Sequence, residues 1–285
     1  MRLFILGLGY SAGHFVSRFG GAFAHIAGTV RNLANRNTIA GVETHAFHAS
    51  DPDGETVEQV RKADVLLVSI PPGNHGDPAI GAFADTLAAK RSQKIIYLST
   101  IGVYGDHGGA WVDETTPPQA TLERTRSRLA AEQAWVELTG GDVAILRLAG
   151  IYGPGRNALA ALRAGSARRI VKPGQVFNRI HVADIASAIM AAVRHQGGGI
   201  WNICDDEPAP PQDVIAYAAK LMGVAAPAEE AFASAEMSAM ARSFYGGNAR
   251  VSNAKAKREL GVTLAFPDYR QGLDALWDAG EGGAR

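Results

Sequence analysis

Seven short apolar runs, separated by segments with helical periodicity, constrain the fold of this chain more than any other feature. Near-continuous apolar strands that alternate with helices are typical of a parallel sheet covered on both faces. The sequence therefore predicts an α/β fold with a doubly wound parallel sheet. We expect strands at 2–7, 25–30, 43–48, 64–70, 94–99, 142–148 and 199–204, and helices at 11–20, 56–63, 79–90, 122–139 and 182–194.

A glycine-rich turn follows the first predicted strand. Two glycines permit a tight turn and let backbone amides approach a pyrophosphate, and the helix that follows supplies free N–H groups. At the end of the first strand of an alternating chain, this G-x-G-x-x-A spacing predicts a dinucleotide site and a Rossmann fold. The alternative is a tight turn without ligand. The residues of this stretch are Gly7, Leu8, Gly9, Tyr10, Ser11 and Ala12.

The end of the second predicted strand indicates which dinucleotide is bound. An Asp or Glu about 20 residues after the glycines would accept from a ribose 2′-hydroxyl and favour NAD. The stretch GTVRN has no acid there, and Arg31 takes that place. A guanidinium is a planar fork of donors suited to a 2′-phosphate. We predict NADP as the cofactor, with NAD possible; the alternative is that Arg31 stacks on adenine or faces water.

The next two strand ends supply further candidate contacts. Asp51 follows the third strand, where its carboxylate could accept from the adenine amino group. Alternatively, Asp51 or Asp53 caps the helix near residue 56. The fourth strand ends in Ser69, Ile70 and Pro71, which should pass beneath the cofactor because ligands lie at the carboxyl ends of such strands.

The pattern of short strands loosens after Gly153, where Gly, Pro and Arg recur. We therefore expect a dinucleotide-binding Rossmann domain at 1–153 and a smaller, mostly helical substrate-binding half at 154–285. Segment 182–204 should return to the sheet. Further helices are expected at 211–222, 234–243, 252–260 and 269–279.

Composition excludes several classes of protein. The 28 Lys and Arg residues balance the 28 Asp and Glu residues, so a nucleic-acid or membrane-surface partner is not indicated. No apolar run approaches the roughly 20 residues of a membrane helix. The single cysteine, Cys204, cannot form an internal disulfide, and a cytoplasmic location is expected. No Cys/His cluster has metal-ligand spacing, and no metal is predicted.

Several motifs, in order and spacing, resemble those of the extended short-chain dehydrogenase/reductase family, which includes nucleotide-sugar epimerases and dehydratases. With the glycine turn, the resemblance covers almost the whole chain. The motifs are YLSTIGVYGD after the fifth strand, LRLAGIYGPG at the end of the sixth, RIHVADIASAI at 179–189, WNICDDEP at 201–208 and NAKAKRELG at 253–261.

The resemblance implies roles for individual residues. Thr100 matches the family's catalytic Ser/Thr, which hydrogen-bonds the substrate oxygen, and Ser99 precedes it. The alternative for Thr100 is a hydroxyl that satisfies local backbone. The backbone segment beside the nicotinamide matches Ala149, Gly150 and Ile151.

The family's Tyr-x-x-x-Lys is changed in this chain. The stretch RTRSRLAAEQ places Arg124 at the Tyr and Arg128 at the Lys. Arg128 can still donate to a ribose. Arg124 has no accessible conjugate base near neutrality, but it could stabilise a developing alkoxide while water delivers the proton. Tyr104, Tyr152 and His181 are the alternative proton donors, and each could instead be structural.

The expected function follows from these residues. We expect hydride transfer to or from a carbonyl or alcohol carbon of a small molecule. That substrate could be anionic or a nucleotide sugar, since cations recur in the C-terminal half, although scattered arginines often face water. The alternatives are a non-catalytic NADP-binding sensor or a nucleotide-sugar epimerase or dehydratase. The family also suggests a homodimer. The cations are Arg156, Arg168, Arg169, Arg179, Arg242 and Arg250.

Overall fold

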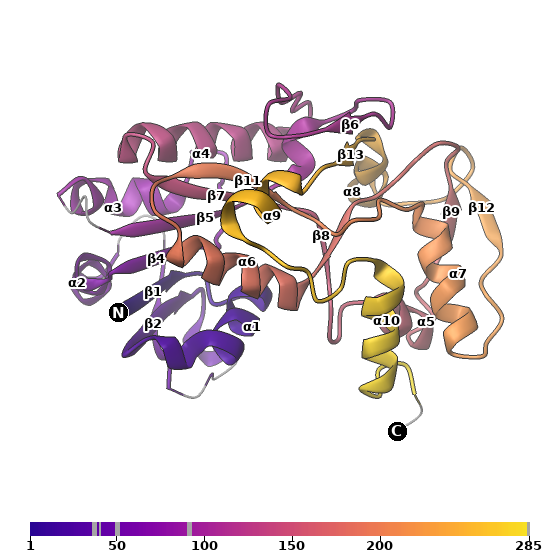
Figure 1. Cartoon of the computed structure of the whole chain (residues 1–285), viewed down its shortest axis with the longest axis horizontal. Coiled ribbons are helices and arrows are strands. Elements are labelled where there is room, and N and C mark those ends of the chain that lie inside the picture. Colours follow the sequence, from indigo (N-terminus) through magenta and orange to yellow (C-terminus); the bar gives the residue numbers. More distant parts are fainter. Residues whose placement is uncertain (36–38, 40, 49–51, 90–92, 284–285) are drawn as a thin grey trace.

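A seven-stranded parallel sheet forms the centre of the computed structural model (Figure 1). The structure describes residues 1–35, 39, 41–48, 52–89 and 93–283. The strand order is β11-β7-β5-β4-β1-β2-β3, which confirms the doubly wound Rossmann topology. The strands are β1 (Arg2–Leu6), β2 (His25–Val30), β3 (Glu43–Ala46), β4 (Val65–Val68), β5 (Lys94–Thr100), β7 (Val143–Leu148) and β11 (Gly199–Ile203).

Helices cover both faces of this sheet because successive apolar side chains of each strand point to opposite faces. One face carries Leu3 and Ile5 and packs against α1 (Tyr10–Phe19) and α6 (Val182–Arg194). The other carries Phe4 and Leu6. It packs against α2 (Gly54–Lys62), α3 (Pro78–Ala88) and α4 (Glu123–Thr139).

The chain leaves the main sheet after β7. Strand β8 (Gly150–Tyr152) pairs with β10 (Arg179–His181), which directly precedes α6. Helix α6 then packs on one face of the main sheet, and strand β11 joins that sheet beside β7. The strand pairs β9–β12 and β6–β13 are small and parallel. Their bounds are β6 (Trp111–Val112), β9 (Arg169–Val171), β12 (Glu229–Ala231) and β13 (Arg250–Val251).

The C-terminal half has its own apolar core. Leu159, Val214 and Leu273 pack together there. Figure 1 shows α5, α7 and α10 gathered at one end of the molecule, away from the main sheet. The helices of this half are α5 (Ala158–Arg163), α7 (Pro211–Leu221), α8 (Ala239–Ser243), α9 (Ala254–Leu260) and α10 (Tyr269–Asp278).

The helix expected at 234–243 is shorter than the sequence predicted. Helix α8 begins only at Ala239. The Ser238 hydroxyl accepts from the Ala241 amide at 3.2 Å and so caps the helix at that point. Four 3₁₀ turns complete the described elements: η1 (Gly20–Ala22), η2 (Leu33–Asn35), η3 (Ile101–Tyr104) and η4 (Phe244–Gly246).

Candidate functional site

The turn after β1 requires a glycine at its first position. Gly7 has φ of +97°, and a Cβ there would lie 2.7 Å from Ile70 Cγ2. The Gly7 amide donates to Thr29 Oγ1 at 3.0 Å, and the Leu8 amide donates to the Thr29 carbonyl at 2.8 Å. These bonds hold the turn against β2. The chain therefore passes closely over the end of β4 in a conformation that other residues rarely adopt.

The N-terminus of α1 is open where the turn ends. Gly9 is exposed and is the N-cap residue, and no side chain caps the helix. A Cβ at Gly9 would meet no atom within 4 Å. Ala12, the third motif position, is fully buried against the sheet. The first-turn amides of α1 are thus placed to bind an anion such as a pyrophosphate, and the residues present fit that group.

Tyr10 joins this helix to the C-terminal half. Its hydroxyl donates to the Pro154 carbonyl at 3.0 Å, although the two residues are 144 positions apart. The Arg156 guanidinium lies 5.9 Å from the centre of the Tyr10 ring. The loop that follows β8 is therefore held beside the N-terminus of α1, and Arg156 brings a positive charge to that end.

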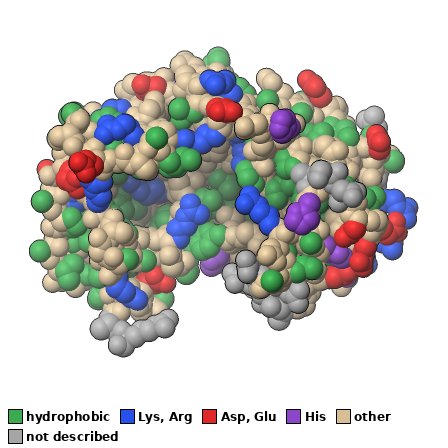
Figure 2. All heavy atoms as spheres, turned by 180° about the vertical axis from the view of Figure 1, so that it is seen from behind, with side chains coloured by type: hydrophobic (Ala, Val, Ile, Leu, Met, Phe, Trp, Pro, Cys, Tyr) green, Lys and Arg blue, Asp and Glu red, His purple; other side chains and the backbone are tan. Residues whose placement is uncertain are grey.

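A cavity of about 780 Å³ lies between the carboxyl ends of the central strands and the C-terminal half. Figure 2 shows this face of the molecule hollowed, with Lys and Arg side chains around the hollow. The cavity brings together ten of the residues predicted from the sequence. They are Ser11, Ser69, Pro71, Ser99, Thr100, Arg124, Arg128, Ala149, Gly150 and Ile151.

Other predicted residues do not line the cavity directly. Ile70 packs against Gly7. Of the turn residues, Ser11 lines the cavity, and its neighbours in the chain are not among the lining residues: Gly7, Leu8, Gly9, Tyr10 and Ala12.

Two further predictions concern the adenosine end. Arg31 follows β2, is exposed, and has no ion-pair partner among the residues that the structure describes. Asp51 lies outside the described residues. Asp53 caps α2, since its carboxylate accepts from the Thr56 amide at 2.6 Å.

Arg128 is held firmly at the base of the cavity. One guanidinium nitrogen donates to the Tyr97 hydroxyl at 2.9 Å and to the Leu98 carbonyl at 3.0 Å. Both partners belong to β5, the strand that ends in Thr100. The remaining N–H groups have no partner among the described residues. Arg128 can therefore donate to a bound ligand from a fixed position.

Arg124 connects the two halves of the molecule across the cavity. Its guanidinium donates to Ser243 Oγ at 2.6 Å and lies 4.8 Å above the Phe244 ring. Ser243 ends α8, and both partners also line the cavity. Their role was not predicted from the sequence, because no pattern in the chain joins residues this far apart. Arg124 acts as an electrostatic contact in this arrangement, with no conjugate base to offer.

Thr100 and Ser99 have different surroundings at the end of β5. Thr100 Oγ1 accepts from the Gly102 amide at 3.1 Å and caps η3, while its own hydroxyl hydrogen has no acceptor among the described residues. Thr100 lines the cavity, so that hydrogen is available to a ligand oxygen. Ser99 is buried and donates to Glu132 at 2.5 Å. Ser99 therefore contributes to the support of the site.

A buried ion pair lies beneath these two residues. Arg147 on β7 donates from two nitrogens to Glu132 on α4, with a shortest distance of 2.7 Å. It also donates to the Tyr104 hydroxyl at 3.0 Å. Sequence reasoning missed this pair; its signal was Arg147, a charged residue inside the apolar run of β7. The pair fixes α4, and with it Arg124 and Arg128, against the sheet.

The alternative proton donors are held in structural contacts. The Tyr104 hydroxyl is buried and donates to Asn202 at 2.9 Å. His181 accepts from the Ala183 amide at 3.2 Å and caps α6, and burial lowers its pKa to about 4. Tyr152 lines the cavity, but burial raises its pKa and its hydroxyl points to the Asp268 carbonyl at 3.5 Å. None of the three has a pKa near neutrality.

The charge of the cavity is positive. Arg124, Arg128, Arg156 and Arg179 line it, and the described lining residues include no Asp or Glu. The other predicted cations of the C-terminal half are engaged elsewhere. Arg168 pairs with Glu230 and Arg169 with Glu229, while Arg242 donates to Phe232 and Ala235 carbonyls and Arg250 to the Gly109 carbonyl.

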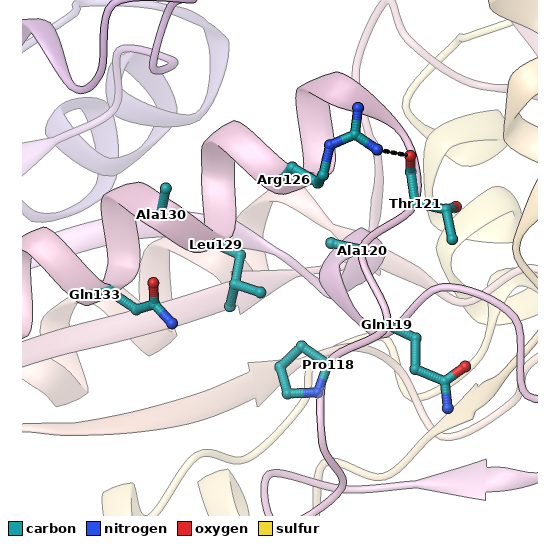
Figure 3. A pocket seen from close by; sticks show the side chains of 8 residues that line it. All are labelled: Pro118, Gln119, Ala120, Thr121, Arg126, Leu129, Ala130 and Gln133. Atoms are coloured by element: carbon teal, nitrogen blue, oxygen red, sulfur yellow. Dashed lines mark hydrogen bonds between the residues drawn. The ribbon is translucent and has the colours of Figure 1, made fainter.

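A second, smaller hollow lies on the other side of α4. It has a volume of about 440 Å³ and is lined by residues such as Arg126, Leu129 and Gln133 (Figure 3). Arg126 donates to the Thr121 carbonyl there. The two hollows show that α4 presents Arg124 and Arg128 to the large cavity and Arg126 to the opposite side, as the four-residue spacing predicts.

No helix within the described part of the chain has the length and apolar character needed to cross a membrane.

Comparison with known proteins identifies a family model and relatives that this chain matches. Residues 82–204 match the model of the NAD dependent epimerase/dehydratase family. Protein YeeZ of Escherichia coli strain K12 is 30% identical over 226 residues, which cover 76% of each chain. A functionally unknown conserved protein from Silicibacter pomeroyi DSS has a solved structure with 45% identity and a TM-score of 0.89, covering 98% of this chain and 99% of the other.

A more distant solved structure is similar in fold. MoeE5, in complex with UDP-glucuronic acid and NAD, has a TM-score of 0.79 and 17% identity, and the match covers 96% of this chain and 97% of MoeE5.

Proposed function

This chain belongs to the NAD-dependent epimerase/dehydratase family, and on that premise we propose that it binds NADP and transfers hydride to or from a carbonyl or alcohol carbon of an anionic small molecule. One observation carries the proposal. The large cavity extends from the start of α1 to the C-terminal half and has four arginines and, among the described lining residues, no carboxylate. Such a cavity favours ligands with phosphate or carboxylate groups.

The cofactor is proposed to lie along the strand ends. The amides at the start of α1 would hold its pyrophosphate, and Arg31 would meet the adenosine 2′-phosphate. Distant solved relatives such as MoeE5 were captured with NAD, so the preference for NADP depends on Arg31 replacing the expected acid. A bound nicotinamide cofactor supplies the hydride chemistry. Ala149, Gly150 and Ile151 would form the backbone wall beside its reactive ring.

The chain's own residues would orient the substrate. Thr100 can donate its free hydroxyl hydrogen to the substrate oxygen, and Arg128 on α4 can donate to the cofactor ribose from the position in which its bonds to β5 hold it. Arg124 would stabilise negative charge that develops on that oxygen, with water supplying the proton. Arg156 and Arg179 would hold an anionic group of the substrate. A nucleotide sugar, as bound by MoeE5, is one class that carries such a group.

A nucleotide sensor is the second candidate. It is favoured by the ionisable groups that line the cavity: four arginines and Tyr152, whose pKa is raised. None of these described groups transfers protons readily near neutral pH. The location and assembly of the protein stay predictions. The buried thiol of Cys204 fits a reducing cytoplasm, and a homodimer is expected from the family.

Titration with NADPH and NADH tests the cofactor. We expect tighter binding of NADPH by roughly ten- to a hundredfold, since a hydrogen bond to a charged group contributes about 1.5–3 kcal/mol. Arg31→Ala should abolish this preference, whereas Arg61→Ala, a change at an exposed arginine of α2 away from the cavity, should preserve it. Equal affinities of the wild type for both nucleotides would contradict the choice of NADP.

Turnover tests the chemistry separately. We expect NADPH oxidation with at least one anionic carbonyl compound in a panel of keto-sugar nucleotides and keto acids. A chain that binds NADPH tightly but shows no turnover with the whole panel would instead support the sensor.

A further inference from the structure

A group of possible metal ligands lies outside the cavity lining, at the edge of the main sheet. Glu43 and His45 are two residues apart on β3, so their side chains project from the same face of the sheet. Helix α2 covers that face and brings Glu55 from its first turn. One ligand atom from each of the three residues lies within 4.8 Å of the other two. His25 on β2 approaches the same Glu43 carboxylate from the side.

The Nε2 atoms of His45 and of the neighbouring His25 lack hydrogen-bond partners among the described residues. His45 is 7% exposed, and its Nε2 atom is buried without a hydrogen bond within the described residues. The Nε2 atom of His25 is likewise buried without a hydrogen bond within the described residues. A buried polar atom without a partner is costly, so this arrangement needs an explanation. Both nitrogens are directed at Glu43, whose carboxylate also accepts weakly from Gln59 at 3.3 and 3.4 Å.

The distances match those between ligands of one small cation. His45 Nε2 lies 3.2 Å from one Glu43 oxygen, and His25 Nε2 lies 3.4 Å from the other. Tetrahedral Zn²⁺ with bonds of about 2.0–2.1 Å has ligand atoms about 3.3 Å apart. Neither approach has hydrogen-bond geometry. The His45 nitrogen and the Glu43 oxygen are thus spaced as two ligands of one ion would be, with no hydrogen bond between them.

We propose that Glu43, His45 and Glu55 bind a divalent transition-metal ion of the Zn²⁺ type. Imidazole nitrogen with carboxylate oxygen is a donor set that suits Zn²⁺, whereas Mg²⁺ and Ca²⁺ prefer oxygen alone. The imidazole comes from the protein interior, and the two carboxylates are exposed, so the ion can enter from solvent. The site would join the edge strand β3 to α2. It goes beyond the proposed nucleotide chemistry and shares none of its residues.

Titration of chelator-treated protein with Zn²⁺, without nucleotide, tests this site. We expect one equivalent to bind, and the Tm to rise by roughly 5 °C or more at a Zn²⁺ concentration of about 100 Kd. Co²⁺ in place of Zn²⁺ should give visible absorption bands of a low-symmetry, four-coordinate ion. Glu43→Gln and Glu55→Gln keep the side-chain size and lie at exposed positions, so both variants should fold as judged by circular dichroism.

The Glu43→Gln and Glu55→Gln variants test whether these two carboxylates are the metal ligands. Each Gln substitution should weaken Zn²⁺ binding about tenfold or more, while His75→Ala, which removes an exposed histidine outside the group, should leave it unchanged. Absence of a stoichiometric Zn²⁺ site in the wild type would overturn the proposal and leave the histidines as ion-pair partners of Glu43. Binding that survives both Gln substitutions in folded protein would also overturn it.

Discussion

The buried ion pair beneath the cavity gives a quantitative test of how the site is supported. Arg147 and Glu132 have side chains only 4% and 3% exposed, and they meet at 2.7 Å. Glu132→Gln keeps the shape of the side chain but removes its charge. Arg147 is then left as a buried cation whose remaining partners are neutral. Breaking one side of a buried pair costs about 3–5 kcal/mol.

This energy predicts a large fall in thermal stability. For a chain of this size, 1 kcal/mol corresponds to about 2–4 °C, so Glu132→Gln should lower the Tm by about 10 °C. The measurement is thermal unfolding followed by circular dichroism at neutral pH. The matched control is Glu58→Gln, which breaks an exposed pair with Arg61 and should not shift the Tm measurably.

A double replacement separates the charge from the packing. Glu132→Leu combined with Arg147→Met removes both charges and keeps similar volumes. We expect the double variant to regain most of the stability that Glu132→Gln loses, because no uncompensated charge remains. A fall of less than about 2 °C in Glu132→Gln would refute the reasoning, since Arg147 would then not depend on this carboxylate.

Two further predictions concern a buried carboxyl group and a contact across the cavity. Burial raises the pKa of Asp205 to about 8, so the folded state keeps a proton that the unfolded chain releases near pH 4. The contribution of the Asp205 carboxyl to stability is complete below about pH 4 and is lost as the pH rises through 8. Asp205→Asn should therefore raise the Tm at pH 8 but not at pH 4. Equal Tm shifts at both pH values would contradict this. Arg124→Ala should speed hydrogen–deuterium exchange in residues 239–247, because the contacts with Ser243 and Phe244 are lost. The control Arg126→Ala should leave this exchange unchanged. Unchanged exchange in both variants would show that Arg124 does not anchor this segment.

The candidate site could be predicted from the sequence wherever its residues lie in one local pattern. The glycine turn was predicted from its own spacing, and Thr100, Arg124 and Arg128 were predicted through motifs that resemble those of the family. The structure places Thr100 and both arginines on one cavity. It also shows that Arg124 contacts Ser243, which lies 119 positions away. The helix expected at 234–243 was too long because helical composition does not reveal where a serine caps the first turn.

The sequence by itself determined the order of strands and helices, because the periodicity of apolar side chains acts over a few residues and sets which face of each element is buried. Only the tertiary structure decided which charges meet. The Arg147–Glu132 pair, the Tyr10 contact with Pro154 and the grouping of Glu43, His45 and Glu55 all join separate elements. Such contacts depend on how helices pack on the sheet, and packing is a property of the whole folded chain.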